Sequence, residues 1–380
     1  MSKKKPKVAF PHVGTLYIGL ESLIKGLGGE VVVAPYSSKR TLSLGTKHSP
    51  EAMCLPYKLI LGNFIEAIEH GAEAVVMISS PGICRLGEYG KAMKHALKDL
   101  NLNVKYYDFD LYKGFGVMYD GLIELTGVRN PFRIIYSIIV GISKIFVLDK
   151  LENVFSYYRA REINSGDAEK AFKRGIRKIE NVFTIKELRK AEKEATEEIK
   201  KVDIDKNREI LHVDITGEIF MVIDPFSNQN IERELGRLGV QTRRTLTISS
   251  WIRDAIVPKI FIKGETHLQR SMRLAKRYLT RDIGGDSIEA ISDIIYADDK
   301  GTDGIIHISP FTCMPEIMSQ NIFPAMRKDC KIPLLPLIMD EQTGRAGYIT
   351  RLEAFVDLMR RRKRMLATNK NVEQAETVNA

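Results

Sequence analysis

The chain has 380 residues, of which 44% are hydrophobic and 28% charged, and its formal net charge is +10. This is the composition of ordinary globular proteins, and the length predicts more than one lobe. Four cysteines in this length exclude a disulfide scaffold and favour the reducing cytoplasm. The basic charge lies partly in MSKKKPK at the start and in RRRKR at 360–364, which predicts solvated ends and no nucleic-acid-binding module.

Residues 7–127 alternate short apolar runs with segments of helical spacing, which predicts a parallel sheet with helices on both faces. Gly28 and Gly29 close the first helical segment. The predicted strands are KVAF (7–10), EVVVAP (30–35), AVVMIS (74–79) and VKYYDFD (104–110), and the predicted helices are TLYIGLESLIKGLG, CLPYKLILGNFIEAIEHG and KAMKHALKDLN.

Residues 128–208 are nearly continuous in helix-forming residues, with Lys and Glu at i,i+4 spacing, so they predict a helical connecting segment. The most apolar run, IIYSIIVGISKIFVL at 134–148, contains Lys144. A membrane span needs about 20 apolar residues, so this shorter run predicts a buried helix and no membrane insertion.

Residues 209–340 return to alternation and predict a second Rossmann-like lobe. A C-terminal helix is expected within 341–366, and the polar residues 367–380 predict a disordered tail. The sequence therefore predicts an α/β protein with two lobes, each built on a parallel sheet, joined by a helical segment. The predicted elements of the second lobe are strands at 218–225, 304–309 and 332–340 and a helix at 230–239.

Two cysteines sit in the same local frame, SPGIC at 80–84 and SPFTC at 309–313, each directly after a predicted strand. Ligands of open parallel sheets bind beyond the carboxyl ends of the strands, so we expect Cys84 and Cys313 at the rims of the two lobes. Cys54 follows the second strand and precedes a helix, so it joins them in the cleft between the lobes. Cys330 precedes a strand and is expected at the opposite end, as an ordinary packed thiol.

Three converging thiolates favour a soft metal centre. An iron–sulfur cluster with three cysteine ligands would leave one iron open. Zinc held by three cysteines and His12 or His48 is a competing interpretation, and so are three unrelated buried thiols.

Other polar residues near these cysteines are candidates for proton transfer or charge balance. His12 follows the first strand and could donate a proton or bind substrate, although a loop contact is the simpler role. Glu51, Glu88 and Glu316 could carry protons or stabilise helix starts. Lys58 and Arg85 could offset the negative charge of a thiolate-ligated cluster.

The segments VAFPHVGTLY, HSPEAMCLPYKLILGNFIEAIEHGAEAVV, SSPGICRLGEYG, HISPFTCMPE and MDEQTGRAGYITRLEAFVD carry a family resemblance. With them the chain resembles the 2-hydroxyacyl-CoA dehydratase D-component superfamily, in particular the branch described as CoA enzyme activase. The resemblance covers most of residues 7–360 and is weakest in the helical segment.

This resemblance implies two Rossmann-like lobes with a [4Fe–4S] cluster between them, held by Cys54, Cys84 and Cys313. It also implies a partner ATPase of the sugar kinase/actin-like fold that supplies low-potential electrons, an acyl-CoA or other small-molecule substrate, and assembly as a homo- or heterodimer. The chain would then be a dehydratase-like lyase or a reductase subunit. Two alternatives stay open: a non-catalytic electron relay or accessory protein of such a system, and a two-lobe binding protein with zinc or no metal.

Overall fold

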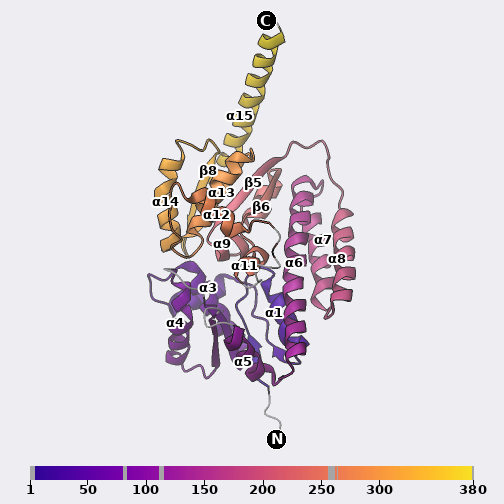
Figure 1. Cartoon of the computed structure of the whole chain (residues 1–380), viewed down its shortest axis with the longest axis vertical. Coiled ribbons are helices and arrows are strands. Elements are labelled where there is room, and N and C mark those ends of the chain that lie inside the picture. The colour runs from indigo at the N-terminus through magenta and orange to yellow at the C-terminus, as the bar shows by residue number, and fades with distance from the viewer. Residues whose placement is uncertain (1–4, 80–83, 111–114, 256–261, 263, 379–380) are drawn as a thin grey trace.

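The structure of the chain is a computed structural model that describes residues 5–79, 84–110, 115–255, 262 and 264–378. Figure 1 shows two lobes stacked along the long axis, with a group of helices running along one side. Each lobe contains one four-stranded sheet, and all strand pairs in the two sheets are parallel. The predicted α/β fold with two Rossmann-like lobes joined by helices is therefore confirmed.

The first lobe is built on the strand order β2-β1-β3-β4. Its inner strands are buried because helices cover both faces, as Val/Ile-rich parallel strands require. The edge strand β2 spans only two residues of the predicted run at 30–35. The elements are β1 (Lys7–Ala9), α1 (Leu16–Gly26), β2 (Glu30–Val31), α2 (Lys39–Lys47), α3 (Leu55–Glu69), β3 (Ala74–Ser79), α4 (Leu86–Asp99), β4 (Lys105–Asp110) and α5 (Phe115–Thr126).

The second lobe repeats this arrangement with the order β6-β5-β7-β8. The strands β3 and β7, which precede Cys84 and Cys313, therefore hold equivalent places in the two sheets. The elements are β5 (Leu211–Gly217), α9 (Ile219–Ile223), α10 (Ile231–Arg237), β6 (Val240–Arg244), α11 (Ile248–Ala255), α12 (His267–Ala275), α13 (Ser287–Asp299), β7 (Gly304–Pro310), α14 (Met314–Met326) and β8 (Leu334–Met339).

The strand predicted at 218–225 is wrong. The strand there is β5, which ends at Gly217, and the apolar residues 219–223 form the short helix α9. Gly217 has φ +123°, a conformation that ends the strand, and the Glu218 carboxylate accepts the Met221 N–H at 2.9 Å to start the helix. A short apolar run fits a buried strand or a buried helix equally well, so periodicity could not separate them.

The connecting segment consists of α6 (Pro131–Arg161), α7 (Asp167–Glu180) and α8 (Ile185–Lys200). Among the described residues α6 is the one helix long and apolar enough to cross a membrane, a property it shares with core helices, and 39% of its most apolar window is buried. The Lys144 side chain is fully buried within that window and donates to the Glu180 carbonyl at 2.9 Å. In the fold α6 packs against α1 on one side and α7 and α8 on the other (Figure 1).

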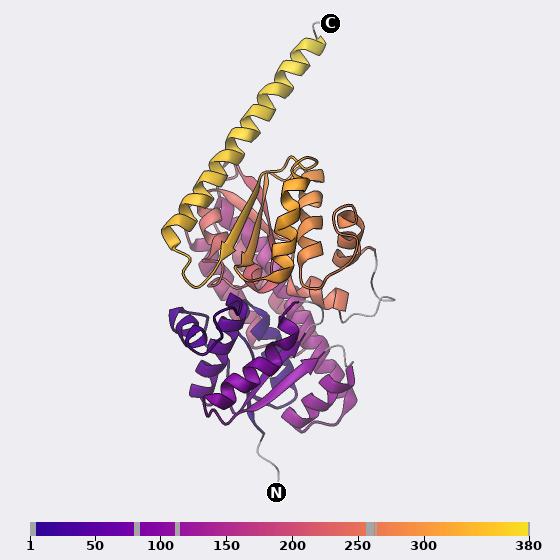
Figure 2. The ribbon, with the colours of Figure 1, turned by 90° about the vertical axis from the view of Figure 1, so that its left-hand side faces the viewer.

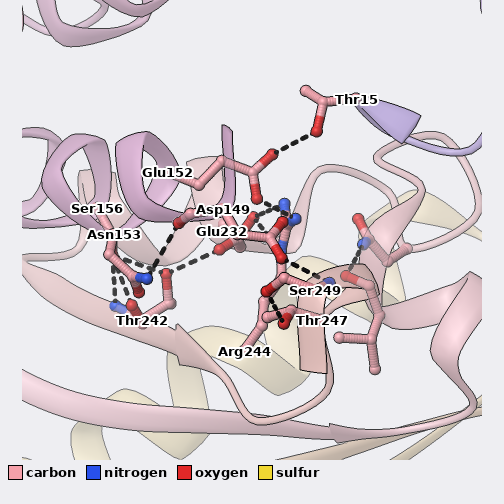
Figure 3. Close-up of polar contacts among 12 residues, drawn as sticks. Thr15, Asp149, Glu152, Asn153, Ser156, Glu232, Thr242, Arg244, Thr247 and Ser249 are labelled. Atoms are coloured by element: carbon pink, nitrogen blue, oxygen red, sulfur yellow. Dashed lines mark hydrogen bonds and ion pairs between the residues drawn. The ribbon is translucent and has the colours of Figure 1, made fainter. Parts of the chain in front are cut away.

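A polar cluster joins the three parts of the chain (Figure 3). Arg244 at the end of β6 donates to Glu152 of α6 at 2.6 Å and to Glu232 of α10 at 2.5 Å. Glu152 also accepts a hydrogen bond from Thr15 of the first lobe at 3.4 Å. The cluster thus links the first lobe, α6 and the second lobe.

The last helix, α15 (Arg345–Val378), packs its first turns on the second lobe and then projects away from it (Figure 2). It begins within the predicted range 341–366 but runs on to Val378, through most of the segment expected to be disordered. The residues from 360 to 368 are mostly good helix formers, which favours continuation of the helix beyond its packed part.

Candidate metal centre

The carboxyl ends of the two sheets face each other. Arg85, after β3, donates to the carbonyl of Ala52 at 2.8 Å and to that of Thr312, after β7, at 3.3 Å. Lys58 of α3 pairs with Glu341, after β8, at 2.7 Å, and its side chain is 3% exposed. The largest cluster of buried apolar side chains also includes residues of both lobes. The loops that carry the cysteines therefore meet at the boundary between the lobes.

Cys54 lies immediately before α3, with Pro56 in the first turn of that helix. Its sulfur is hydrogen-bonded to the hydroxyl of Tyr89, which comes from α4. Burial raises the pKa of the Cys54 thiol, while the Tyr89 hydroxyl and, more weakly, Arg85 oppose the shift. Arg85 is therefore placed to favour the thiolate of Cys54, as charge balance at a cluster would require.

Cys313 holds the matching position before α14, with Pro315 in the first turn. Burial raises the pKa of its thiol, and Glu316, Glu218 and Cys84 raise it further. Cys313 is 7% exposed. The thiols of Cys54 and Cys313 are thus protonated in the metal-free protein, and metal binding would have to displace their protons.

Cys84 precedes α4 and lies beside the second lobe. A Cβ atom added to Gly285 would come within 2.6 Å of Pro315 and 3.6 Å of the Cys84 Cβ. Gly285 has φ +72° and so brings a loop of the second lobe into direct contact with the first. The rest of the repeated frame, Ser80 to Ile83, lies outside the described residues.

Two residues at this site were missed by the sequence analysis. Burial raises the pKa of Tyr89 well above its ordinary value, and the neighbouring Cys54, Glu218 and Cys84 raise it further. Burial raises the pKa of Glu218 to about 8, and Asp286 adds to the shift. Tyr89, five residues after Cys84, was detectable from its place in the first turns of the helix, whereas Glu218 comes from a segment that was predicted to be a strand.

The other predicted site residues lie apart from the cysteines. The backbone N–H of His12 donates to the Asn63 side chain. Asn63 is nine residues along the helix from Cys54, so the two residues are roughly 13 Å apart at the helical rise. The His12 ring stacks on Tyr17, and its Nδ1 lies 3.1 Å from the Ala34 carbonyl. Burial lowers the pKa of His12 to about 4, so it is neutral at physiological pH.

Glu51 and Glu88 are both exposed to solvent. Glu88 is exposed and pairs with Lys91 one turn later at 2.9 Å. Glu51 is exposed, and its backbone carbonyl accepts from Lys58 at 3.2 Å. His48 is the residue that ends α2. Lys58 forms the ion pair with Glu341 between the lobes. Of the two predicted cations, Arg85 is therefore the one that lowers the pKa of a thiol, that of Cys54.

The three cysteines do not form a closely spaced set of donors for a single metal ion in the part of the chain that the structure describes. In the described residues no three His, Cys, Asp or Glu side chains come together closely enough to hold one metal ion. A cubane cluster binds each cysteine to a different iron, so its ligands lie further apart than those of one ion. Cys54, Cys84 and Cys313, each at or just before a helix start, are the candidate donors for either kind of centre. Cys330 packs among the apolar residues of the second lobe beyond the far end of α14, roughly 20 Å along that helix from Cys313.

No protein-family model matches the chain, and no curated protein matches it in sequence.

Proposed function

We propose that the chain is a cytoplasmic iron–sulfur protein of the 2-hydroxyacyl-CoA dehydratase or ATP-dependent reductase type. Cys54, Cys84 and Cys313 would hold a [4Fe–4S] cluster between the two lobes. The observation that carries the proposal is the convergence of these thiols, from both lobes, on the boundary where the carboxyl ends of the two sheets meet.

When bound, such a cluster supplies low-potential electron transfer and one iron open to a further ligand. The chain's own residues would prepare the site in three ways. Arg85 holds the Ala52 and Thr312 loops together and favours the thiolate of Cys54. Tyr89 orients the Cys54 sulfur by its hydrogen bond. Glu218 carries a proton at neutral pH, because its pKa is about 8.

The proposal includes a partner. The sequence has no phosphate-binding loop of the G-x-x-x-x-G-K-[ST] kind, so ATP hydrolysis is assigned to a separate ATPase of the sugar kinase/actin-like fold. The substrate would be an acyl-CoA or another small molecule, and the protein would work as a homo- or heterodimer without nucleic acid or membrane. A relay that only passes electrons would use the same site, and turnover with the partner ATPase separates the two roles.

Anaerobic purification with iron and sulfide analysis tests the proposal. We expect about four irons and four sulfides per chain, and an EPR signal from the reduced protein. Cys54→Ser, Cys84→Ser and Cys313→Ser should each abolish the cluster, whereas the matched control Cys330→Ser should retain it.

Circular dichroism of the variants separates loss of the cluster from loss of the fold. A colourless, iron-free protein from an anaerobic preparation would refute the cluster. If Cys330→Ser also loses iron while it remains folded, the assignment of the ligands is wrong.

A further inference from the structure

Two cavities lie side by side on the second lobe, at the end opposite the cysteines. The first has a volume of about 520 Å³ and lies where β5 and β6 begin, and the second, of about 410 Å³, lies against α15. Gly301 and Thr302, which follow α13, line both cavities. We call the two together the α15 groove. Its size falls in the range of small-molecule sites.

Cationic side chains outnumber carboxylates along the α15 groove. Four cations line it, and the two carboxylates, Asp214 and Asp303, are both engaged. Asp214 forms a two-point ion pair with Arg243, and Asp303 accepts the His212 N–H at 2.8 Å and lies 3.6 Å from Lys363. The cations are Arg243, Lys300, Arg362 and Lys363.

Lys300 and Arg362 supply the positive charge that remains. Among the described residues neither forms an ion pair with a carboxylate. The Lys300 ammonium lies 5.5 Å from the centre of the Tyr296 ring, a cation–π contact that holds it at the wall of the first cavity. Arg243 is fixed by Asp214, yet its side chain is 49% exposed. The groove thus presents cations from β6, from the end of α13 and from α15.

We propose that the α15 groove binds a phosphorylated small molecule of nucleotide size. Phosphate oxygens match guanidinium and ammonium donors. The Tyr296 ring carries Lys300 at 5.5 Å and Arg243 at 5.9 Å from its centre, which holds both cations beside the first cavity. The groove lies at the amino ends of β5 and β6 and beside the C-terminal end of α13, whose dipole does not favour an anion. Its affinity for an anion must therefore come from side chains, which the cation excess provides. This inference does not rest on the proposed cluster.

The basic run at 360–364 does not form a free stripe for a nucleic acid. Arg360 donates to the Leu238 carbonyl at 2.7 Å, and Lys363 donates to the Ile210 carbonyl at 3.1 Å. Two of the five cations in this run, Arg360 and Lys363, are thus anchored to the lobe, and Arg362 and Lys363 line the second cavity. This arrangement favours a compact anion over an extended polyanion.

Isothermal titration calorimetry of the full chain with inorganic pyrophosphate and with ADP tests the proposal. Lys300→Glu and Arg362→Glu each replace attraction by repulsion, and each should weaken pyrophosphate binding by about tenfold or more. Lys190→Glu is the matched control, because Lys190 is 82% exposed on α8 and lies outside the groove. Tighter binding of ADP than of pyrophosphate would show a ring contact as well, and equal binding would show that the phosphates alone are recognised.

Three results would overturn the proposal. The first is no binding of either probe by the folded wild-type protein. The second is binding that neither Lys300→Glu nor Arg362→Glu changes. The third is a labelled single-stranded oligonucleotide that binds in dependence on both residues and that pyrophosphate does not displace, which would make the groove a nucleic-acid site.

Discussion

Substitution of Arg244 by methionine should cost the protein a large part of its stability. Arg244 is 13% exposed and pairs with two carboxylates, Glu152 at 2.6 Å and Glu232 at 2.5 Å, which are themselves 17% and 16% exposed (Figure 3). Methionine retains much of the apolar stem but removes the charge. Two nearly buried carboxylates would then share one site, and the cation that remains within ion-pair distance in the described part of the chain is Arg159, 3.5 Å from Glu232.

The magnitude follows from opposing contributions. At pH 8, where Glu152 is mostly ionised, each ion pair contributes about 4 kcal/mol of attraction at an effective dielectric constant of about 20 and a charge separation of about 4 Å, so about 8 kcal/mol is lost. Part of this loss is offset, because the variant no longer has to bury a charged guanidinium, and that burial costs several kcal/mol of hydration free energy. The net loss in the free energy of unfolding is therefore about 3–5 kcal/mol, the range known for buried pairs that lose one partner.

Urea unfolding followed by circular dichroism measures this loss. Arg237→Met is the matched control, because Arg237 is 51% exposed and pairs with Glu234 at 3.2 Å within one helix, so its loss should be below about 0.5 kcal/mol. If Arg244→Met loses less than about 1 kcal/mol, the cluster contributes little to the junction of the lobes, and our reasoning about it is wrong.

Two further predictions concern stability. In Gly45→Ala the new Cβ would lie 1.6 Å from the Lys58 carbonyl oxygen, so we expect the free energy of unfolding, measured by thermal unfolding, to fall by about 3 kcal/mol or more. Gly347→Ala is the control, because no atom lies within 4 Å of its new Cβ, and it should change little. Equal melting temperatures of the two variants would contradict this. Burial raises the pKa of Glu152 from 4.5 to about 7 in the folded protein, so folding favours the protonated carboxyl. The contribution of this protonated carboxyl to stability is complete below about pH 4.5 and is lost as the pH rises through 7. Relative to Glu152→Gln, the wild-type free energy of unfolding should therefore fall by on the order of 3 kcal/mol between pH 4.5 and 8, and parallel pH profiles would refute the assignment.

Features determined by neighbours along the chain were predictable. The helices that end before Gly28 and Gly239 do so because these glycines adopt φ +73° and +75°, which other residues rarely do. The alternation of strands and helices predicted parallel sheets, and parallel sheets place the residues after their strands at one edge. Cys84 and Cys313 each follow a strand, so this rule alone predicted that they lie at the carboxyl edges of the two sheets.

The places of Glu218 and His12 were not predictable from periodicity and topology alone. Glu218 reaches the thiols because α9 starts where a strand was predicted, and that start depends on Gly217 and on the capping contact with Met221. His12 was expected near the cysteines because it also follows a strand. The ring instead stacks on Tyr17, whose hydroxyl donates to Glu180 of the connecting segment, so packing against α7 decides its place.

The equivalence of the two lobes explains part of the cysteine site and leaves an asymmetry. Cys84 and Cys313 follow strands that hold the same place in the two sheets, so the repeated frame follows from the repeated topology. Cys54 precedes α3 in the first lobe, and the second lobe offers no thiol to match it. The group from the second lobe that acts on both Cys54 and Cys313 is the Glu218 carboxyl. If the proposed cluster is present, the protonated Glu218 carboxyl is the proton donor next to it. Glu218→Gln keeps the shape and removes the acid, so it should leave reduction of the cluster unchanged and slow a reaction that consumes that proton.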